Sequence, residues 1–356
     1  MFKSKAEAER KIRDFFPNET HAVLISALAP AIFFEPAEAA NAPLGGTRIG
    51  GTPDLPPDMH WPLRASPANL HEIAERGGSS HRTHNLKHLA LDYPFEFFAQ
   101  VDLAEAAALG DIAKDLPTEG RLLFFYDSMT GPWNDAKSVT RVIWDRSAKA
   151  ALQRKPIPDV LQKLAREYNI PDPEELQVQR TQDLASIAYL EKGDPEAFAE
   201  IRDAIIEGTD PEKQTEFKPP YWGEPQTKET KTVWTLPVRF SIEAQTHDSL
   251  RALFETSFEE DDETLDFSDV YDEFMEVHRP EEARGRPHQL LGLPSSEQDD
   301  PRYDAAAAEP LGTPFADRDD LQKQKDEIMR NARDWLLLLQ ISLADCMQDD
   351  LIEGTV

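Results

Sequence analysis

The amino-acid sequence predicts an α+β protein made of two related β-rich halves, with helical insertions between and around them. Three observations support this fold class: period-2 apolar strands in two separate regions, helical spacing in the stretch between them, and a pentapeptide that occurs twice. The parts, which can pack as one compact domain, are N-terminal helices (1–42), a first β-rich repeat (43–149), a helical insertion (150–231) and a second β-rich repeat with acidic helices (232–356).

The internal repeat is the most informative feature of the sequence. Gln100-Val101-Asp102-Leu103-Ala104 returns as Gln340-Ile341-Ser342-Leu343-Ala344, each time after an apolar run. A Gly-x-Pro precedes both copies: 49 residues separate Gly51 from Gln100, and 48 separate Gly292 from Gln340. Spacing that agrees over so long a stretch favours a duplicated unit over chance. We therefore expect the strands that hold Gln100 and Gln340 to occupy equivalent places.

Apolar spacing assigns the elements of the first half in order. Helical spacing around Ile12 and over 19–28 predicts two N-terminal helices, the first of which Pro17 ends. Dense Gly and Pro over 43–62 exclude a long helix and predict a loop. Apolar runs then predict three strands, at 95–103, 122–126 and 139–144. In the first of these strands Glu96, Gln100 and Asp102 form a polar face.

The second half is assigned in the same way. Helical spacing predicts insertion helices at 160–168, 182–190 and 195–206. A single strand is predicted over 234–242, and Pro237 places it at an edge or at a bulge. Its core face is expected to carry Trp234, Leu236, Val238, Phe240 and Ile242, with Arg239 and Ser241 facing away. Two acidic helices over 245–277 and a long helix over 317–334 complete the expected elements.

Net charge restricts the classes of partner. Lys and Arg total 38 against 67 Asp and Glu, which gives a net charge of −29. Such a chain repels phosphate backbones and anionic lipids, so we expect neither a nucleic acid nor a membrane as partner. The single cysteine, Cys346, forms no internal disulfide, and no apolar run reaches the length of a membrane helix. These features predict a cytoplasmic protein in a reducing compartment.

Common catalytic and cofactor signatures are missing, and we expect no cofactor. The Gly-rich stretch from Gly45 to Gly51 is followed by Thr52-Pro53-Asp54-Leu55-Pro56-Pro57, which does not open the helix that a phosphate loop requires. His81, His84 and His88, with His71 at a distance, have the spacing of a metal site on one helical face. Glycines precede them and no acidic residue stands close by in sequence, so we expect a solvated loop and no metal.

Two groups of residues are candidates for binding. The first is a pocket built from the Gly/Pro loop and polar strand positions: Gly51, Asp54, Trp61, Gln100, Asp102 and Gln340. No catalytic residue is assigned, because nothing in the sequence pairs Asp102 with a second acid–base group. The second group is Glu259, Glu260, Asp261, Asp262 and Glu263. This acidic run lacks the glycine of a calcium loop, and it is either a solvated helical face or a docking surface for a basic protein.

Several motifs together resemble the YwqG-like family (DUF1963). They are Gly50-Gly51-Thr52-Pro53-Asp54-Leu55-Pro56 with Trp61-Pro62, Phe98-Ala99-Gln100-Val101-Asp102-Leu103, Gly120-Arg121-Leu122-Leu123-Phe124-Phe125-Tyr126-Asp127, His288-Gln289-Leu290-Leu291-Gly292-Leu293-Pro294 with Gln298, and Asp334-Trp335-Leu336-Leu337-Leu338-Leu339-Gln340-Ile341. The resemblance covers roughly 50–145 and 233–356 and leaves 150–231 as an insertion. It implies a bacterial α+β protein of unknown activity, with a further strand beyond the position of Gly354 and no established catalytic residue.

The resemblance also implies a role, because some family members are suspected to be immunity proteins that neutralise toxins. We therefore expect a non-enzymatic cytoplasmic binding protein that docks a basic, toxin-like partner, without assigning an oligomeric state. The alternative is an enzyme or small-ligand-binding protein with a pocket around the Gly/Pro loop, Trp61, Gln100 and Asp102. A cleft with titratable groups of shifted pKa would favour the alternative, and an acidic face without such a cleft would favour binding.

Overall fold

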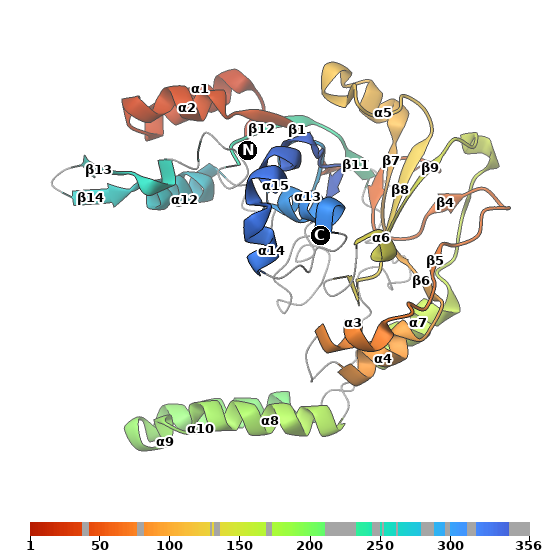
Figure 1. The fold of residues 1–356 in the computed structure, drawn as a ribbon, viewed down its shortest axis with the longest axis vertical. Coiled ribbons are helices and arrows are strands. Elements are labelled where there is room, and N and C mark those ends of the chain that lie inside the picture. Colours follow the sequence, from red (N-terminus) through yellow and green to blue (C-terminus); the bar gives the residue numbers. More distant parts are fainter. Residues whose placement is uncertain are drawn as a thin grey trace.

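The fold is α+β, as predicted, and it centres on two four-stranded antiparallel sheets (Figure 1). The computed structural model describes residues 1–37, 43–76, 82–128, 130–131, 136–168, 173–210, 233–243, 250, 253–260, 263–278, 288–295, 300–311 and 318–341. The first sheet has the order β3 (Arg48–Ile49), β7 (Glu96–Asp102), β8 (Arg121–Tyr126), β9 (Thr140–Asp145). The second has the order β12 (Val238–Ser241), β1 (Ala29–Phe33), β15 (Gln289–Leu290), β16 (Leu339–Gln340).

The main hydrophobic core joins the two sheets. Phe98, Val101 and Phe124 of the first sheet belong to the same buried cluster as Ile32 and Leu290 of the second. Helix α5 (Leu103–Ala107), which begins directly after β7, adds Leu103 and Ala106 to this cluster. The core thus takes residues from both ends of the chain. A core shared by both sheets buries apolar side chains that each sheet would otherwise expose to water.

Strand β7 is buried along its whole length, on both faces. A bulge between Phe97 and Ala99 turns the strand, so that Phe97 packs with Phe95 and Phe125 below the sheet while Phe98 and Ala99 face the main core. The bulge also separates the predicted polar face, since Glu96 lies on the opposite side of the strand from Gln100 and Asp102. All three polar side chains are buried, so they need partners inside the protein. They therefore form the buried networks of the candidate site.

A second core lies under the N-terminal helices. Helices α1 (Lys5–Phe15) and α2 (His21–Ser26) pack with α12 (Phe267–His278) through Ile12, Leu24, Phe267 and Phe274. Ser4 caps α1, because its side chain accepts the backbone N–H of Glu7. Both N-terminal helices were predicted, but the segment 1–42 is not only helical. It also contains β1 and β2 (Glu35–Ala37), which are paired with strands from the far end of the sequence.

Smaller elements surround the sheets. Helices α3 (Leu70–Arg76) and α4 (Arg82–Leu89) pack on each other through Ile73, Ala74 and Leu89. Helices α13 (Pro301–Leu311) and α15 (Lys325–Asn331) form another small cluster. The remaining elements are β4 (Asp54–Leu55), β5 (Leu63–Arg64), β6 (Tyr93–Pro94), α6 (Ala136–Val139), β10 (Gln153–Arg154), α7 (Asp159–Tyr168), β11 (Val233–Thr235), β13 (Ser257–Glu260), β14 (Glu263–Asp266) and α14 (Arg318–Lys323).

The predicted helical insertion contains α8 (Pro173–Ile187), α9 (Leu190–Gly193) and α10 (Pro195–Gly208), which lie apart from the two sheets (Figure 1). Helices α8 and α10 contact each other, and Arg180 of α8 donates hydrogen bonds to Thr209 after α10. Asp194 and Pro195 give α10 the capping residue and first-turn proline that its sequence predicts. Val178, Tyr189 and Ile201 of this insertion are exposed.

Four predicted elements are wrong in detail. The insertion helix expected over 182–190 is α8, which begins earlier, at Pro173, and ends at Ile187. The strand predicted over 234–242 is two strands, β11 and β12, because Pro237 interrupts the pairing. Ser241, which was expected to face away from the core, is buried, and Arg239 pairs with Glu35. In the acidic segment the hairpin β13–β14 occupies 257–266, where helix was expected; among the described residues before it, Leu250 is helical and Leu253–Glu255 form a 3-10 turn, and α12 follows it. The long C-terminal helix is divided into α14 and α15 at Gln324. The sequence patterns do not contain these breaks because pairing with distant strands and local packing decide them.

The two segments of the predicted repeat have matching local geometry. Arg48 pairs with Gln100 across β3–β7, and Gln289 pairs with Gln340 across β15–β16. After each first strand the backbone has two consecutive positive φ angles, at Gly50 (69°) and Gly51 (72°) and at Leu291 (61°) and Gly292 (82°). Each glutamine accepts a backbone N–H from the loop, that of Asp54 (3.0 Å) or that of Ser295 (2.9 Å). Outside this motif the match ends: β7 continues to β8, whereas β16 is the outer strand of its sheet among the described residues.

Candidate functional site

The Gly/Pro loop closes around Asp54, which is completely buried. Two cations reach its carboxylate: Arg48 Nη1 lies 3.0 Å from Oδ2, and Arg154 Nε lies 3.0 Å from Oδ1. The backbone N–H of Gly45 also donates to Oδ2 (2.9 Å). Gly45 reaches this position with φ of 74°, a conformation that strongly favours glycine. The loop is therefore held by a charge network in its own interior.

Gln100 completes this loop network. Its Nε2 donates to the carbonyl of Gly46 (2.7 Å) and to Asp54 Oδ2 (3.0 Å), while its Oε1 accepts from Asp54 N–H. Burial by itself would raise the pKa of Asp54, but the charge of Arg48 and the hydrogen bonds from Arg154 and Gly45 outweigh it and hold the pKa below its ordinary value. Burial lowers the pKa of Arg48 to about 10, a value at which the guanidinium stays charged at neutral pH.

The other residues of the predicted pocket lie elsewhere. Gly51 belongs to the turn of the same loop, but Trp61 donates through Nε1 to the carbonyl of Phe95 (2.8 Å) and packs edge-on against Phe125. Asp102 caps α5 through the N–H of Ala104 (3.1 Å) and pairs with Lys149. Gln340 lies in the second sheet and bonds Ser295. The structure thus brings Asp54 and Gln100 together and gives Trp61, Asp102 and Gln340 separate local roles.

A second buried network surrounds the end of β8, at Asp127. Arg64 Nε contacts Asp127 Oδ2 (2.6 Å), and His88 Nε2 lies 3.1 Å from Oδ1. Thr130 donates its backbone N–H (3.1 Å) and its hydroxyl (2.7 Å) to the same carboxylate. Four segments of the chain, β5, α4, β8 and the turn after β8, therefore meet at one side chain.

Glu96 lies beside this group and has a different set of partners. The Tyr93 hydroxyl hydrogen-bonds to its Oε1, and Ser128 donates its backbone N–H and its hydroxyl (3.2 Å each). Burial, together with the charge of Asp127, raises the pKa of Glu96 to about 8. Burial also acts on Asp127, but the bond and charge of His88, the Thr130 hydroxyl and Arg64 lower its pKa to about 2. At neutral pH the carboxyl group of Glu96 is therefore protonated and that of Asp127 is ionised.

The two carboxyl groups resemble an acid–base pair in chemistry but not in access. Their pKa values are pushed apart, as in catalytic sites where one carboxyl donates a proton and another stays ionised. Yet Glu96 and Asp127 are both completely buried, and Arg64, His88 and Tyr93 around them are at most 4% exposed. The arrangement can hold a proton on Glu96 and fix four chain segments together. It offers no side chain to a substrate from outside.

The histidines considered for a metal site are separated by the structure. His88 lies on α4, is buried and contacts Asp127, so the expected solvated loop is wrong for this residue. Its carboxylate partner Asp127 comes from a position 39 residues away, so proximity in sequence did not reveal it. His81 and the side chain of His84 lie outside the described residues. Within the described ranges no group of three or more His, Cys, Asp or Glu side chains could hold a metal ion.

Sequence reasoning missed the Arg64–His88–Asp127 group. Arg64 is separated from Asp127 by 63 residues, so no local spacing connects them. One signal was present, since Asp127 follows directly on the apolar run Leu122-Leu123-Phe124-Phe125-Tyr126. A charged residue at the end of a central strand needs a partner if the strand is covered on both sides.

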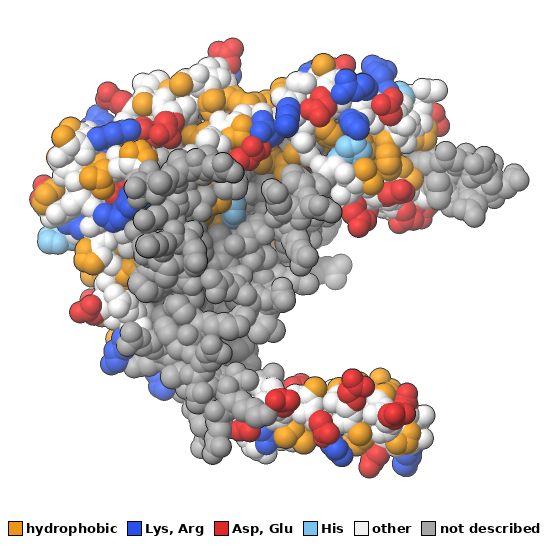
Figure 2. Space-filling model, turned by 180° about the vertical axis from the view of Figure 1, so that it is seen from behind, with side chains coloured by type: hydrophobic (Ala, Val, Ile, Leu, Met, Phe, Trp, Pro, Cys, Tyr) orange, Lys and Arg blue, Asp and Glu red, His pale blue; other side chains and the backbone are white. Residues whose placement is uncertain are grey.

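The predicted acidic surface is an arm formed by β13, β14 and α12, hereafter the acidic arm. Glu259 and Glu260 lie in β13 and Glu263 in β14, whereas Asp261 and Asp262 lie outside the described residues. Helix α12 buries Phe267, Tyr271 and Phe274 and exposes Asp269, Asp272, Glu273 and Glu276. The hairpin projects away from the sheets (Figure 1), and acidic side chains gather on the described surface beside it (Figure 2).

Comparison with known families identifies the chain. The sequence profile of DUF1963, a domain of unknown function, matches residues 47–351, which is most of the chain. The chain belongs to the DUF1963 family. The matched region includes both four-stranded sheets except β1, and it also spans the helical insertion. No curated protein matches the sequence.

The DUF1963 chain has no helix, among its described residues, with both the length and the apolar character needed to cross a lipid bilayer.

Proposed function

We propose that this DUF1963 protein is a non-enzymatic cytoplasmic binding protein, of the toxin-neutralising kind, whose acidic arm docks a basic protein. The observation that carries the proposal is that the charged groups are of two kinds, one enclosed in the protein and one on the acidic arm. Carboxyl groups with strongly shifted pKa values are enclosed by their own partners, whereas a dense set of acidic residues is placed on a projecting element. Enclosed charges favour a structural role, and exposed charges of one sign favour recognition of the opposite sign.

Charge density on the arm supports a basic partner. Ten Asp or Glu residues and no Lys or Arg lie between 257 and 278. The strand register of β13 and β14 sets position 260 opposite position 263, so two acidic residues stand at the same level of the hairpin. A partner that carries Lys and Arg would be steered to this segment of one charge sign over a distance of about 10 Å at 0.1 M salt.

The anchoring of the arm also suits docking. Helix α12 is fixed to the body through Phe274, whose ring packs against Phe16 (4.8 Å between centroids) and Phe15 (5.2 Å). The exposed acidic face of α12 is therefore held in one orientation by a rigid aromatic contact. A preorganised charged face loses little conformational freedom when a partner binds.

Neutralising the hairpin tests the proposal. Partners are captured from the native host, and a basic one is selected for kinetics. In the hairpin variant Glu259, Glu260 and Glu263 become Gln and Asp261 and Asp262 become Asn. Because steering depends on net opposite charge, we expect its association rate with that partner to fall about tenfold at low salt, with a flatter dependence on salt. Stopped-flow or surface-plasmon measurements across salt concentrations give both quantities.

A matched control removes the same number of charges from the insertion. In it Glu191, Glu196, Glu200 and Glu207 become Gln and Asp203 becomes Asn, at positions that are all exposed on α9 and α10. This control should keep the association rate within about twofold, since its charges lie outside the arm. Equal slowing by both variants would mean that net charge alone acts. An unchanged rate in the hairpin variant at every salt concentration would contradict the proposal.

A second candidate function, an enzyme or small-ligand-binding protein, has one observation in its favour. The opposite pKa shifts of Glu96 and Asp127 are those of an acid–base pair. The Gly/Pro loop itself favours the first proposal, because Asp54 and Gln100 already use their hydrogen-bonding atoms on each other, on Arg48 and Arg154, and on the loop backbone.

A further inference from the structure

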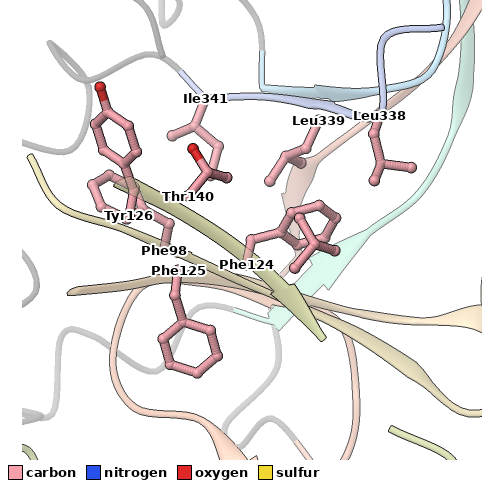
Figure 3. Close-up of a pocket in the computed structure, with 9 residues that line it drawn as sticks. Phe98, Phe124, Phe125, Tyr126, Thr140, Leu338, Leu339 and Ile341 are labelled. Carbon is pink, nitrogen blue, oxygen red and sulfur yellow. The ribbon is translucent and has the colours of Figure 1, made fainter. Parts of the chain in front are cut away.

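An apolar pocket opens between the two sheets, away from the charge networks of the candidate site. Its volume is about 200 Å³, and it lies between β8–β9 of the first sheet and the segment around β16 of the second (Figure 3). Phe98, Phe124, Val142, Leu338, Leu339 and Ile341 contribute most of its apolar wall. A cavity of about 150 Å³ lined by Leu, Ile and Phe accommodates benzene. This pocket is therefore large enough for a substituted ring.

The pocket has a polar end and an apolar end. The labelled side chains of Tyr126 and Thr140 lie near Ile341, whereas Phe124, Leu338 and Leu339 lie together at the other end (Figure 3). No hydrogen bond of the Tyr126 or Thr140 hydroxyl occurs within the described part of the chain. Each hydroxyl can donate one bond and accept others. Two hydroxyls with no hydrogen-bond partner among the described residues, placed beside an apolar wall, can thus orient one polar atom of a ligand.

The surroundings keep the Tyr126 phenol protonated and in place. Burial, and then the charges of Asp127 and Glu96, raise the pKa of Tyr126 above its ordinary value, so that the hydroxyl remains a donor. The ring contacts Phe98 edge-on, with 5.9 Å between centroids. On its other side a Cβ at Gly131 would lie only 1.9 Å from the hydroxyl oxygen, so Gly131 leaves the space that the phenol occupies. Among the described residues, packing against Phe98 and Gly131 holds the phenol.

We propose that this pocket binds a small uncharged ring compound with one hydrogen-bond acceptor. The ring packs on Phe98, Phe124 and Leu339. The acceptor takes hydrogen bonds from the hydroxyls of Thr140 and Tyr126. Among the described residues no charged side chain lines the pocket, so an ionised ligand would lose its hydration without gaining a counter-charge from them. An anion would also face the ionised Asp127 next to Tyr126. This inference is independent of the acidic arm, because the pocket contains no residue of that arm.

Three probes of similar size test this ligand class with the full chain. Acetophenone has a ring and an uncharged acceptor, ethylbenzene has the ring alone, and benzoate has the ring with an anion. We expect acetophenone to bind with a dissociation constant of about 1 mM or below, which is in the range open to a ligand of this size. Ethylbenzene should bind about three- to tenfold more weakly, and benzoate more weakly still. Protein-observed NMR titration gives these constants.

Two variants locate the site. Thr140→Val combined with Tyr126→Phe removes both hydroxyls and should weaken acetophenone binding about tenfold while leaving ethylbenzene unchanged. Val142→Phe places a larger side chain at the pocket from a position that is 40% exposed, and it should abolish binding of both probes. The same change at exposed Val178 on α8 is the control and should have no effect on either probe.

Several results would overturn the proposal. They are the absence of acetophenone binding up to its solubility limit, equal binding of benzoate, and binding that Val142→Phe leaves intact. Binding that occurs only in a chain shortened after Ile341 would also contradict it, since the chain's own C-terminal residues would then be the occupant. A control spectrum of each variant, with unchanged methyl and aromatic shifts remote from the pocket, separates loss of the site from loss of the fold.

Discussion

Glu96 and Asp127 show how the partners of a buried carboxyl group decide its charge. Both side chains are covered completely, and burial favours the neutral form of both. Asp127 nevertheless stays ionised because Arg64 and His88 supply donors and positive charge, whereas Glu96 has only neutral donors, Tyr93 and Ser128, and the charge of Asp127 beside it. Two carboxyls with the same burial therefore differ in pKa by their partners alone.

Replacing Glu96 by Gln should change the pH dependence of stability. In the unfolded chain Glu96 ionises near its ordinary pKa of 4.5, but in the folded protein it ionises only at about 8. Between these values the folded state holds a proton that the unfolded state releases, so stability falls as pH rises, by up to about 1.4 kcal/mol per pH unit, and levels off above the folded pKa. Glu96→Gln removes this contribution, and its stability relative to the wild type should increase across the window.

Urea unfolding of both proteins between about pH 5 and 8 measures the effect. The comparison uses the slope with pH rather than the stability at one pH, because the amide of Gln also changes the hydrogen bonds with Tyr93 and Ser128 by an amount that does not depend on pH. Glu273→Gln, at an exposed position on α12, is the control and should run parallel to the wild type. Parallel curves for Glu96→Gln as well would show that Glu96 is ionised in the folded protein.

At the scale of single elements, the two turns after β3 and β15 share a backbone geometry but differ in the side chains that hold it. Both turns pass through two positive φ angles and return a backbone N–H to a glutamine on the neighbouring strand. In the first turn Asp54 adds a carboxylate with Arg48 and Arg154, and in the second Ser295 adds no charge. We propose that the two turns descend from one duplicated unit, and the shared register and φ angles support this.

Removing the two glutamines should destabilise the protein to different degrees. Gln340→Met leaves the N–H and carbonyl of Ser295 without the side chain that bonds both, which should cost about 2–4 kcal/mol of the free energy of unfolding. Gln100→Met leaves Asp54 N–H and the Gly46 carbonyl unpaired and also removes a donor from a buried carboxylate, so it should cost about 1 kcal/mol more.

Denaturant unfolding of the two variants gives this comparison, and Gln182→Met at an exposed position on α8 is the control. The control should stay within about 0.5 kcal/mol of the wild type. A loss as small as this for Gln100→Met would mean that the loop network contributes nothing to folding stability.

At the scale of the whole molecule, stability is distributed unevenly. Strands β7 and β8 are buried almost throughout and carry the main core, whereas α10 buries no residue. Elements with few buried apolar contacts open locally at small free-energy cost. The insertion is therefore expected to open independently of the two four-stranded sheets.

Hydrogen exchange measured by mass spectrometry should follow this order. We expect the amides of α10 to exchange well before those of β7 and β8, which should open only with global unfolding. Helix α1 is an internal control, because it has a similar length but buries Ala8 and Ile12 completely. Protection of α10 equal to that of α1 would contradict the expected difference and would indicate that the insertion is covered by contacts with the body.

Much of the fold could be predicted from the sequence wherever a local pattern is strong. Alternation identified β7, continuous apolar runs identified β8, and helical spacing identified α1 and the insertion helices. The bulge at Phe98 and the break at Pro237 altered the faces that simple alternation assigned. For the candidate site, the sequence singled out Asp54 and Gln100, which do meet. Arg64, His88 and Asp127 lie far apart in the sequence, and they meet only because four segments of the chain converge in the fold.

The sequence by itself determined the α+β class, the acidic character and the position of the charge-rich segment, because composition and short-range periodicity are local properties of the chain. Only the tertiary structure decided which charges are enclosed and which are presented to solvent. In the sequence Glu96 is a polar residue within a predicted strand and Asp127 directly follows one, and their burial depends on helix α4, on β5 and on the turn after β8. Long-range packing sets the solvation of a carboxyl group, and solvation with its partners sets its pKa and the chemistry open to it.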